Sequence, residues 1–180
     1  VHELWVMGLI YRLLEDYPTA LTYWRKLFSG SNIISFGVWN LTEYAELLVE
    51  SNQTDSALFY YNLFDSARAE TKDLRFFLVS KGEYFHFLKQ YNTALPYFKK
   101  GLTYHSQFKD FAQTKRTLLN IAKVYLAIQQ NDSAIHYARE GIAMALQAKA
   151  KPHIRDGYGI LYSVYERMNK TDSAFHYYQK

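Results

Sequence analysis

The chain has 180 residues, of which 49% are apolar and 21% charged, a balance that is typical of a globular domain and excludes a disordered chain. A formal net charge of +4, with no run of more than two Lys or Arg residues, does not single out a polyanionic partner. The absence of Cys excludes disulfides, thiolate metal sites and cysteine nucleophiles, and no stretch of about 20 apolar residues is present to span a membrane.

Apolar residues recur with the period of an α-helix along the whole chain, and short polar turns separate the helical segments. In chain order, the pattern predicts helices over 1–15, 18–28, 34–51, 55–70, 73–89, 92–107, 110–130, 132–149, 153–168 and 171–180. The breaks at "SGSN" and at Lys151-Pro152 fall between pairs of helices. The opening "VHELWVMGLI" has neither an initiator Met nor a basic leader, so we expect the chain to be part of a longer protein.

A short phrase recurs along the chain, as in "QQNDSAIHYARE" and "NKTDSAFHYYQK", and marks an internal repeat. We interpret the Asp or Asn that precedes Ser or Thr in it as a helix start, where a side-chain oxygen caps free backbone N–H groups. The Ala residues of the five copies are Ala20, Ala57, Ala94, Ala134 and Ala174, spaced by 37, 37, 40 and 40 residues. Three residues after each Ala comes a Tyr, namely Tyr23, Tyr60, Tyr97, Tyr137 and Tyr177.

Small residues also recur in the helix that precedes each phrase, where they would let the backbones of two paired helices approach closely. Twelve residues before the Ala stand Gly8, Ala45, Gly82 and Ala122, whereas the fifth copy has Tyr162. One helical hairpin cannot bury its own apolar face, so repeated hairpins are expected to stack into a continuous core.

Taken together, these columns resemble the tetratricopeptide repeat (TPR) family over essentially the whole chain. The resemblance implies an all-α, right-handed superhelical solenoid of about five antiparallel helix pairs. It implies one domain over 1–180, with repeats at about 1–30, 31–71, 72–108, 109–150 and 151–180. Two features depart from the family pattern: the period exceeds the usual ~34 residues, and Lys81 occupies a normally apolar position. Because of Tyr162, repeat five is expected to pack least regularly. The resemblance also implies that the Tyr column, formed by the Tyr three residues after each Ala, packs between repeats rather than forming a recognition ladder, because in the family the second helix faces the next repeat.

Candidate chemistry is sparse, and we predict no enzymatic activity, catalytic residue, metal site or cofactor for this chain. Glu83 and His86 form one E-x-x-H pair, but no second pair exists to complete a metal site. Metalloprotease, P-loop and nucleophile-elbow motifs are absent. Four Asn-x-Ser/Thr triplets are interpreted as helix-turn chemistry rather than as glycan acceptors.

The resemblance also implies which residues face the concave groove, because in the family the first helix of each repeat lines it. The implied positions are His2, Trp5, Leu9, Arg12, Leu13, Trp39, Thr42, Glu46, Val49, Glu50, Phe76, Val79, Glu83, His86, Phe87, Arg116, Leu119, Lys123, Leu126, Ala127, Asp156, Gly159, Ser163, Glu166 and Arg167. Four of these are basic and five acidic, so the groove is not the basic track that nucleic acid requires. Trp5, Leu9 and Thr42 replace the Lys and Asn of the family's chaperone-tail clamp, which argues against that ligand.

Eleven of these positions form the candidate partner site. They are Trp5, Leu9, Arg12, Trp39, Glu46, Phe76, Val79, Glu83, Phe87, Arg116 and Lys123. The apolar members among them form either a docking patch for an apolar or amphipathic segment, or a set of side chains that reach neighbouring helices and belong to the core.

These observations favour a scaffold that binds a protein or peptide segment, including its own flanking region, with no nucleic acid and no membrane contact. The last phrase, "MNKTDSAFHYYQK", is similar to the TPR sensor regions of bacterial sensor histidine kinases of two-component systems. That resemblance implies a periplasmic sensory module, with a kinase domain outside this chain. The alternatives are a cytoplasmic protein, the regulatory repeats of a transcription regulator, or a purely structural assembly scaffold. The ligand, the stimulus and the oligomeric state have no sequence signature.

Overall fold

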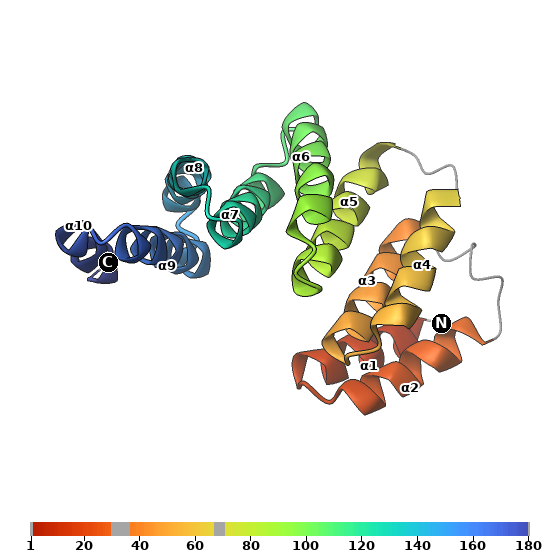
Figure 1. Cartoon of the computed structure of the whole chain (residues 1–180). Coiled ribbons are helices and arrows are strands. Elements are labelled where there is room, and N and C mark those ends of the chain that lie inside the picture. Colours follow the sequence, from red (N-terminus) through yellow and green to blue (C-terminus); the bar gives the residue numbers. More distant parts are fainter. Residues whose placement is uncertain (1, 30–36, 67–70, 180) are drawn as a thin grey trace. The chain divides into compact units, whose positions relative to one another are not determined.

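The computed structural model describes residues 2–29, 37–66 and 71–179, and the side chains of 37–39, 64–66 and 71–73 lie outside the description. The described residues form ten helices and no strand, which confirms the predicted all-α class (Figure 1). The helices are α1 (His2–Leu13), α2 (Tyr17–Phe28), α3 (Gly37–Glu50), α4 (Thr54–Ser66), α5 (Thr71–Phe87), α6 (Tyr91–Gln107), α7 (Phe111–Ala127), α8 (Asn131–Gln147), α9 (Lys151–Arg167) and α10 (Thr171–Tyr178). No helix in these ranges combines the length and apolar character needed to cross a membrane.

The helices group into two compact units, residues 1–80 and 81–180, and the boundary falls inside α5. In the first unit α1 packs on α2 and α3 packs on α4; in the second, α7 packs on α8, and α9 packs on both α8 and α10. The first helices of two successive repeats, α7 and α9, also touch each other. The single domain over 1–180 stays a prediction.

The predicted helix-start chemistry is wrong in its detail. Asp55, Asp132 and Asp172 lie inside the first turns of α4, α8 and α10 instead of preceding them. The residue before α8 is Gln130, whose side chain makes no capping hydrogen bond. An Asp within the first turn still stabilises the helix, because its charge complements the positive end of the helix dipole. A capping side chain appears in α2, where Asp16 accepts a hydrogen bond from the Thr19 backbone N–H.

The turn that ends each first helix uses a left-handed residue, and none of these residues is Gly. The residues at this position are Glu15, Asn52, Lys89, Gln129 and Asn169, with φ between 56° and 62°. The residue that follows donates its N–H to a carbonyl five residues back, as Gln90 does to Phe85 at 2.8 Å. This bond pattern closes a helix end by satisfying carbonyls that have no partner within the helix. The same turn therefore recurs in all five repeats.

The small residues of the first helices face large aromatic rings of the second helices, as the sequence pattern predicted. A Cβ added to Gly8 would lie 2.6 Å from Trp24 Nε1, and one added to Gly82 would lie 2.8 Å from the Phe98 ring. Trp24 is 0% exposed and Phe98 is 1% exposed, so neither ring has room to move away. In repeat five the small residue is replaced by Tyr162. Its ring lies 5.9 Å from that of Tyr178, which is 74% exposed.

The Tyr column packs within its own hairpin, so the predicted role between repeats is incomplete. In four of the repeats the Tyr ring stacks on an aromatic ring of its own first helix at a centroid distance of 5.5 Å. The stacked pairs are Tyr11 with Tyr23, Phe85 with Tyr97, Tyr125 with Tyr137 and Tyr165 with Tyr177. A cation from the preceding repeat completes two of these stacks: Lys99 lies 5.5 Å from the Tyr125 ring, and Arg139 donates a hydrogen bond to the Tyr165 hydroxyl at 3.1 Å.

Candidate functional site

The candidate site lies on the face of α1, α3, α5, α7 and α9 that the resemblance assigned to the groove, here termed the A-helix face. One column of this face belongs to the core. Thr42 is 7% exposed, Val79 4% and Leu119 2%, so these side chains do not present themselves to a partner. They stand fifteen residues before the repeat Ala, a position from which a side chain packs against its neighbours. The assignment of Val79 to the partner site is therefore corrected to a core position.

In residues 1–80 the A-helix face is dominated by Arg12, which joins α1 to three glutamates of α3. The Arg12 guanidinium donates to both carboxylate oxygens of Glu50 at 2.7 and 2.8 Å, to Glu46 at 3.1 Å and to Glu43 at 2.5 Å. The glutamates are spaced by three and four residues, so one helical face presents all of them. The four ionised groups together carry a net charge of −2.

Burial by itself lowers the pKa of Arg12, but the hydrogen bond to Glu50 and the charges of Glu46, Glu50 and Glu43 raise it above its ordinary value. The guanidinium is therefore charged at every physiological pH. The planar guanidinium can donate to several carboxylates at once, so Arg12 forms a fixed electrostatic link between two helices and is not a free cation.

The apolar members of the predicted site in this unit are only partly accessible. Trp5 is half-buried and stacks on His2, with 5.9 Å between ring centroids. Leu9 is also half-buried, and so is Phe76, whose ring lies 4.8 Å from the Arg75 guanidinium. The side chain of Trp39 lies outside the described residues. The structure thus brings Arg12 and Glu46 together.

In residues 81–180 the A-helix face begins with a second charged cluster, which is centred on a carboxylate. Glu83 on α5 accepts two hydrogen bonds from Arg116 Nη2, at 2.6 and 2.8 Å, and one from Asn120 Nδ2 at 2.6 Å. The cluster ties α5 to α7 and places Glu83 and Arg116, both predicted site residues, in direct contact. Phe87, one turn further along α5, is 51% exposed.

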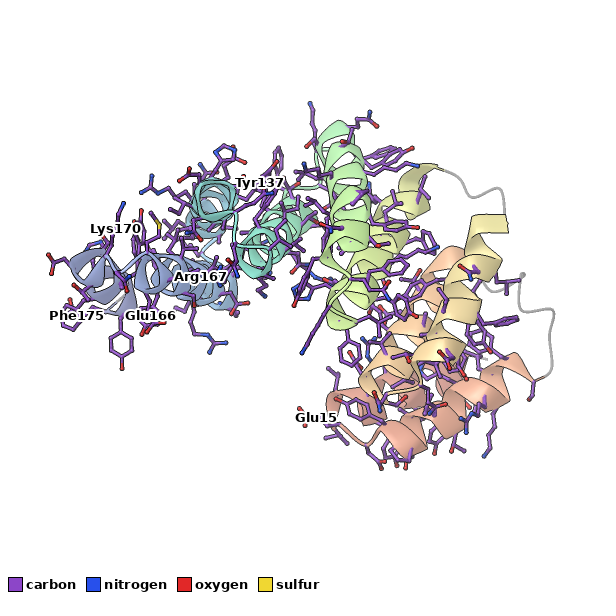
Figure 2. All side chains as sticks on the ribbon, viewed as in Figure 1. Glu15, Tyr137, Glu166, Arg167, Lys170 and Phe175 are labelled. Carbon is purple, nitrogen blue, oxygen red and sulfur yellow. The ribbon has the colours of Figure 1, made fainter. Side chains whose placement is uncertain are left out.

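The same face carries a shallow cavity of about 390 Å³, widely open to solvent, between α7 and α9. Its lining residues are Lys123, Leu126, Arg155, Asp156, Gly159, Ile160 and Ser163. Five of these seven are groove positions implied by the resemblance. The cavity exists because Gly159 stands where repeats two to four have a buried side chain, and a Cβ added there would meet no atom within 4 Å. Arg167 Nη1 donates a hydrogen bond to the backbone carbonyl of Leu126, one of the lining residues. The side chain of Arg167 is labelled in Figure 2.

Two histidines report the electrostatics of this face. Burial lowers the pKa of His153, and Lys115, Arg116 and Lys123 lower it further against the opposing charge of Asp156. Burial and the charge of Lys123 also lower the pKa of His86. Both imidazoles are therefore biased toward the neutral form, first by burial and then by the neighbouring cations.

Sequence reasoning missed Arg155, Ile160 and His153 as members of this region. A helical projection of α9 would have placed Arg155 four residues before Gly159 on a shared face. The burial of His153 depends on the packing of α9 against its neighbours, and no sequence pattern indicates it. Within the described ranges, no group of three or more His, Asp or Glu side chains is arranged to hold a metal ion.

Comparison with known proteins identifies the fold. No family model and no curated protein sequence matches the chain. Among solved structures, aspartyl phosphate phosphatase F from Bacillus subtilis is 21% identical, with a TM-score of 0.79 over 98% of this chain and 48% of that one. A signal transduction ATPase with numerous domains and a tetratricopeptide repeat sensor, from Pyrococcus horikoshii, is 16% identical, with a TM-score of 0.84 over 97% and 28%. PilW, a widely conserved type IV pilus biogenesis factor, is 16% identical, with a TM-score of 0.72 over 96% and 72%.

At these identities the likeness shows the fold alone, and that fold is the helical repeat of the tetratricopeptide type. The chain spans about half the length of the first of these proteins and less than a third of the second.

Proposed function

We propose that this chain, which has the fold of tetratricopeptide-repeat proteins, is an interaction scaffold that holds a polypeptide segment on its A-helix face. The observation that carries the proposal is the cavity between α7 and α9, which combines cations, one carboxylate and apolar side chains on the face assigned to the groove. Such a mixture of a recessed apolar surface and a few polar groups is characteristic of ligand-binding sites.

A peptide library displayed on phage and selected against the whole chain would test this proposal. Enriched peptides should perturb the backbone amide signals of α7 and α9 in an NMR titration, with little effect on the exposed side of α6 and α8. Peptides that bind only to α6 or α8, or a selection that enriches nothing, would contradict it.

The scaffold is further proposed to be the sensory or regulatory module of a bacterial signal-transduction protein, periplasmic if it belongs to a membrane sensor kinase. Support comes from the resemblance of the last repeat to sensor-kinase repeats. Two of the similar structures are described as an aspartyl phosphate phosphatase and as a signal transduction ATPase with a repeat sensor. A phosphorylation assay on the full-length protein tests this: a selected peptide should change the rate of phosphoryl transfer.

A structural assembly scaffold is the second candidate, because PilW shares the fold and is described as a pilus biogenesis factor. Under this alternative the same peptide would bind the full-length protein without any effect on phosphoryl transfer, so one assay separates the two roles.

A further inference from the structure

Charge is divided unevenly between the two units. Residues 1–80 contain 6 Lys and Arg against 10 Asp and Glu, a net charge of −4, whereas residues 81–180 contain 15 against 7, a net charge of +8. The overall value of +4 conceals this division. A unit with a strong net charge attracts partners of the opposite sign and raises their rate of association.

Within residues 81–180, cations gather around the cavity on the A-helix face. Lys123 and Arg155 line it, and both approach Asp156, at 3.9 and 4.0 Å. These separations are at the outer limit of an ion pair, and one carboxylate is shared by two cations. Lys123 is 40% exposed and Arg155 is 85% exposed, so both can reach an additional anion.

The titration of His153 supports this view of the local field. Burial lowers the pKa of His153, Lys115, Arg116 and Lys123 on α7 lower it further, and the carboxylate of Asp156 opposes them. His153 Nδ1 is buried and has no hydrogen-bond partner among the described residues. An anion near Lys123 would reduce the positive field at this imidazole.

The floor of the cavity is apolar. Leu126 and Ile160 contribute side chains, and Gly159 contributes open space, since no atom lies within 4 Å of where its Cβ would be. A volume of about 390 Å³ accommodates an aliphatic side chain of a bound peptide. The site thus offers cations at the rim and an apolar recess below them.

We propose that the A-helix face of residues 81–180 selects an acidic polypeptide segment, with carboxylates against Lys123 and Arg155 and an aliphatic side chain in the cavity above Gly159. The inference rests on the proposed scaffold function and names the chemistry of its ligand. Nucleic acid fits less well, because Glu83, Asp156 and Glu166 on the same face would repel evenly spaced phosphates. A peptide can instead place its carboxylates between them.

The experiment uses the whole chain and fluorescently labelled peptides built from repeated Glu-Glu-Leu triplets, with Lys-Lys-Leu and Glu-Glu-Ser peptides of equal length as controls. Fluorescence anisotropy should show binding of the Glu-Glu-Leu peptide alone. Raising the salt concentration from about 50 to about 200 mM should weaken this binding, because salt screens the attraction between the exposed cations and the peptide carboxylates.

Paired variants locate the site. Lys123→Glu should weaken binding about tenfold or more, since it reverses a charge that faces the ligand. Lys100→Glu makes the same change of charge on the exposed side of α6 and should alter affinity by no more than about twofold. Gly159→Leu should abolish binding by filling the cavity, while circular dichroism shows that the fold is retained.

Equal losses in Lys123→Glu and Lys100→Glu would overturn the inference, because they would mean general attraction without a site. Tight binding of an oligothymidylate that competes with the peptide would overturn it in favour of nucleic acid. Binding of only the Lys-Lys-Leu peptide, lost in Gly159→Leu, would overturn the acidic-ligand inference and leave the scaffold proposal standing. Binding of the Glu-Glu-Ser peptide as tightly as the Glu-Glu-Leu peptide would overturn the role given to the aliphatic side chain. If none of the peptides binds and the phage selection enriches no peptide, both the acidic-ligand inference and the proposed scaffold function are wrong.

Discussion

At the scale of single residues, the volume of a side chain at a fixed repeat position decides how the hairpin packs. Gly82 lets the Phe98 ring lie against the backbone of α5, whereas Tyr162 at the equivalent position of repeat five leaves Tyr178 exposed. Gly159 has the opposite role, because the space over it is open and forms part of the cavity. Glycines on the first helices of two repeats therefore serve unrelated purposes.

Replacing these two glycines with Ala should have opposite effects on stability. Gly82→Ala should lower the free energy of unfolding by about 1–3 kcal/mol, because the added methyl overlaps a ring that cannot move. Gly159→Ala should raise it by about 0.5–1 kcal/mol, since Ala restricts the unfolded chain and meets no neighbour. Urea denaturation of both variants checks this, and a loss in Gly159→Ala would show that its surroundings are occupied.

The two histidines of the second unit predict a specific pH dependence. Their pKa values are lowered from the ordinary 6.5, for His86 by burial and Lys123, and for His153 by burial and the cations of α7. The folded state therefore binds protons less readily than the unfolded state, so stability is complete above pH 6.5 and is lost as the pH falls through the folded pKa values.

A His86→Gln/His153→Gln double variant should lose less stability on acidification than the unsubstituted chain. Thermal unfolding between neutral pH and about pH 5 measures the difference, a range centred near the ordinary histidine pKa. His136→Gln/His176→Gln, which changes two exposed histidines, is the matched control and should follow the unsubstituted chain. Parallel pH profiles for all three proteins would contradict the assigned shifts.

At the scale of the elements, successive first helices are connected by charged side chains as well as by apolar packing. Arg12 connects α1 to α3, and the Glu83–Arg116 pair connects α5 to α7. Both links lie on the A-helix face, where a wholly apolar contact would be exposed to solvent. Charged links thus preserve a polar surface while fixing the spacing of neighbouring repeats.

Arg12→Met should lower the free energy of unfolding by about 1.5–3 kcal/mol, the range for hydrogen bonds to charged groups, because three glutamates then repel one another without a counter-ion. Arg25→Met is the matched control, since Arg25 is exposed and makes one hydrogen bond of 3.3 Å to Gln53. It should cost less than about 0.5 kcal/mol. Similar denaturation midpoints for the two variants would contradict a stabilising link between α1 and α3 through Arg12.

At the scale of the whole molecule, the energetics should be those of a linear array, in which each repeat is stabilised mainly by its neighbours. Gly157 at the junction of repeats four and five illustrates this, because an added Cβ would lie 2.3 Å from Ile142 of α8 and 3.3 Å from Leu119 of α7. A side chain added at Gly157 would therefore disrupt packing within residues 81–180.

Gly157→Ala should therefore reduce hydrogen-exchange protection in α7 to α10 and leave that of α1 and α2 nearly unchanged, since local opening follows contiguous structural units. Mass spectrometry of exchanged peptides measures both regions in one sample, and Gly159→Ala serves as the nearby control. A uniform loss of protection along the chain would show instead that the array unfolds as one cooperative body.

The sequence by itself determined the ten helices, their pairing and the small residues between them, because these follow from local periodicity and from repetition. The observed helices end within about four residues of the predicted limits, as local signals allow. The burial of Val79, the cavity over Gly159 and the partners of Arg12 and Arg116 depended on contacts between repeats. A repeat pattern says which residues share a face, but the volumes and charges that meet across two helices decide which of them fill the core and which surround a site.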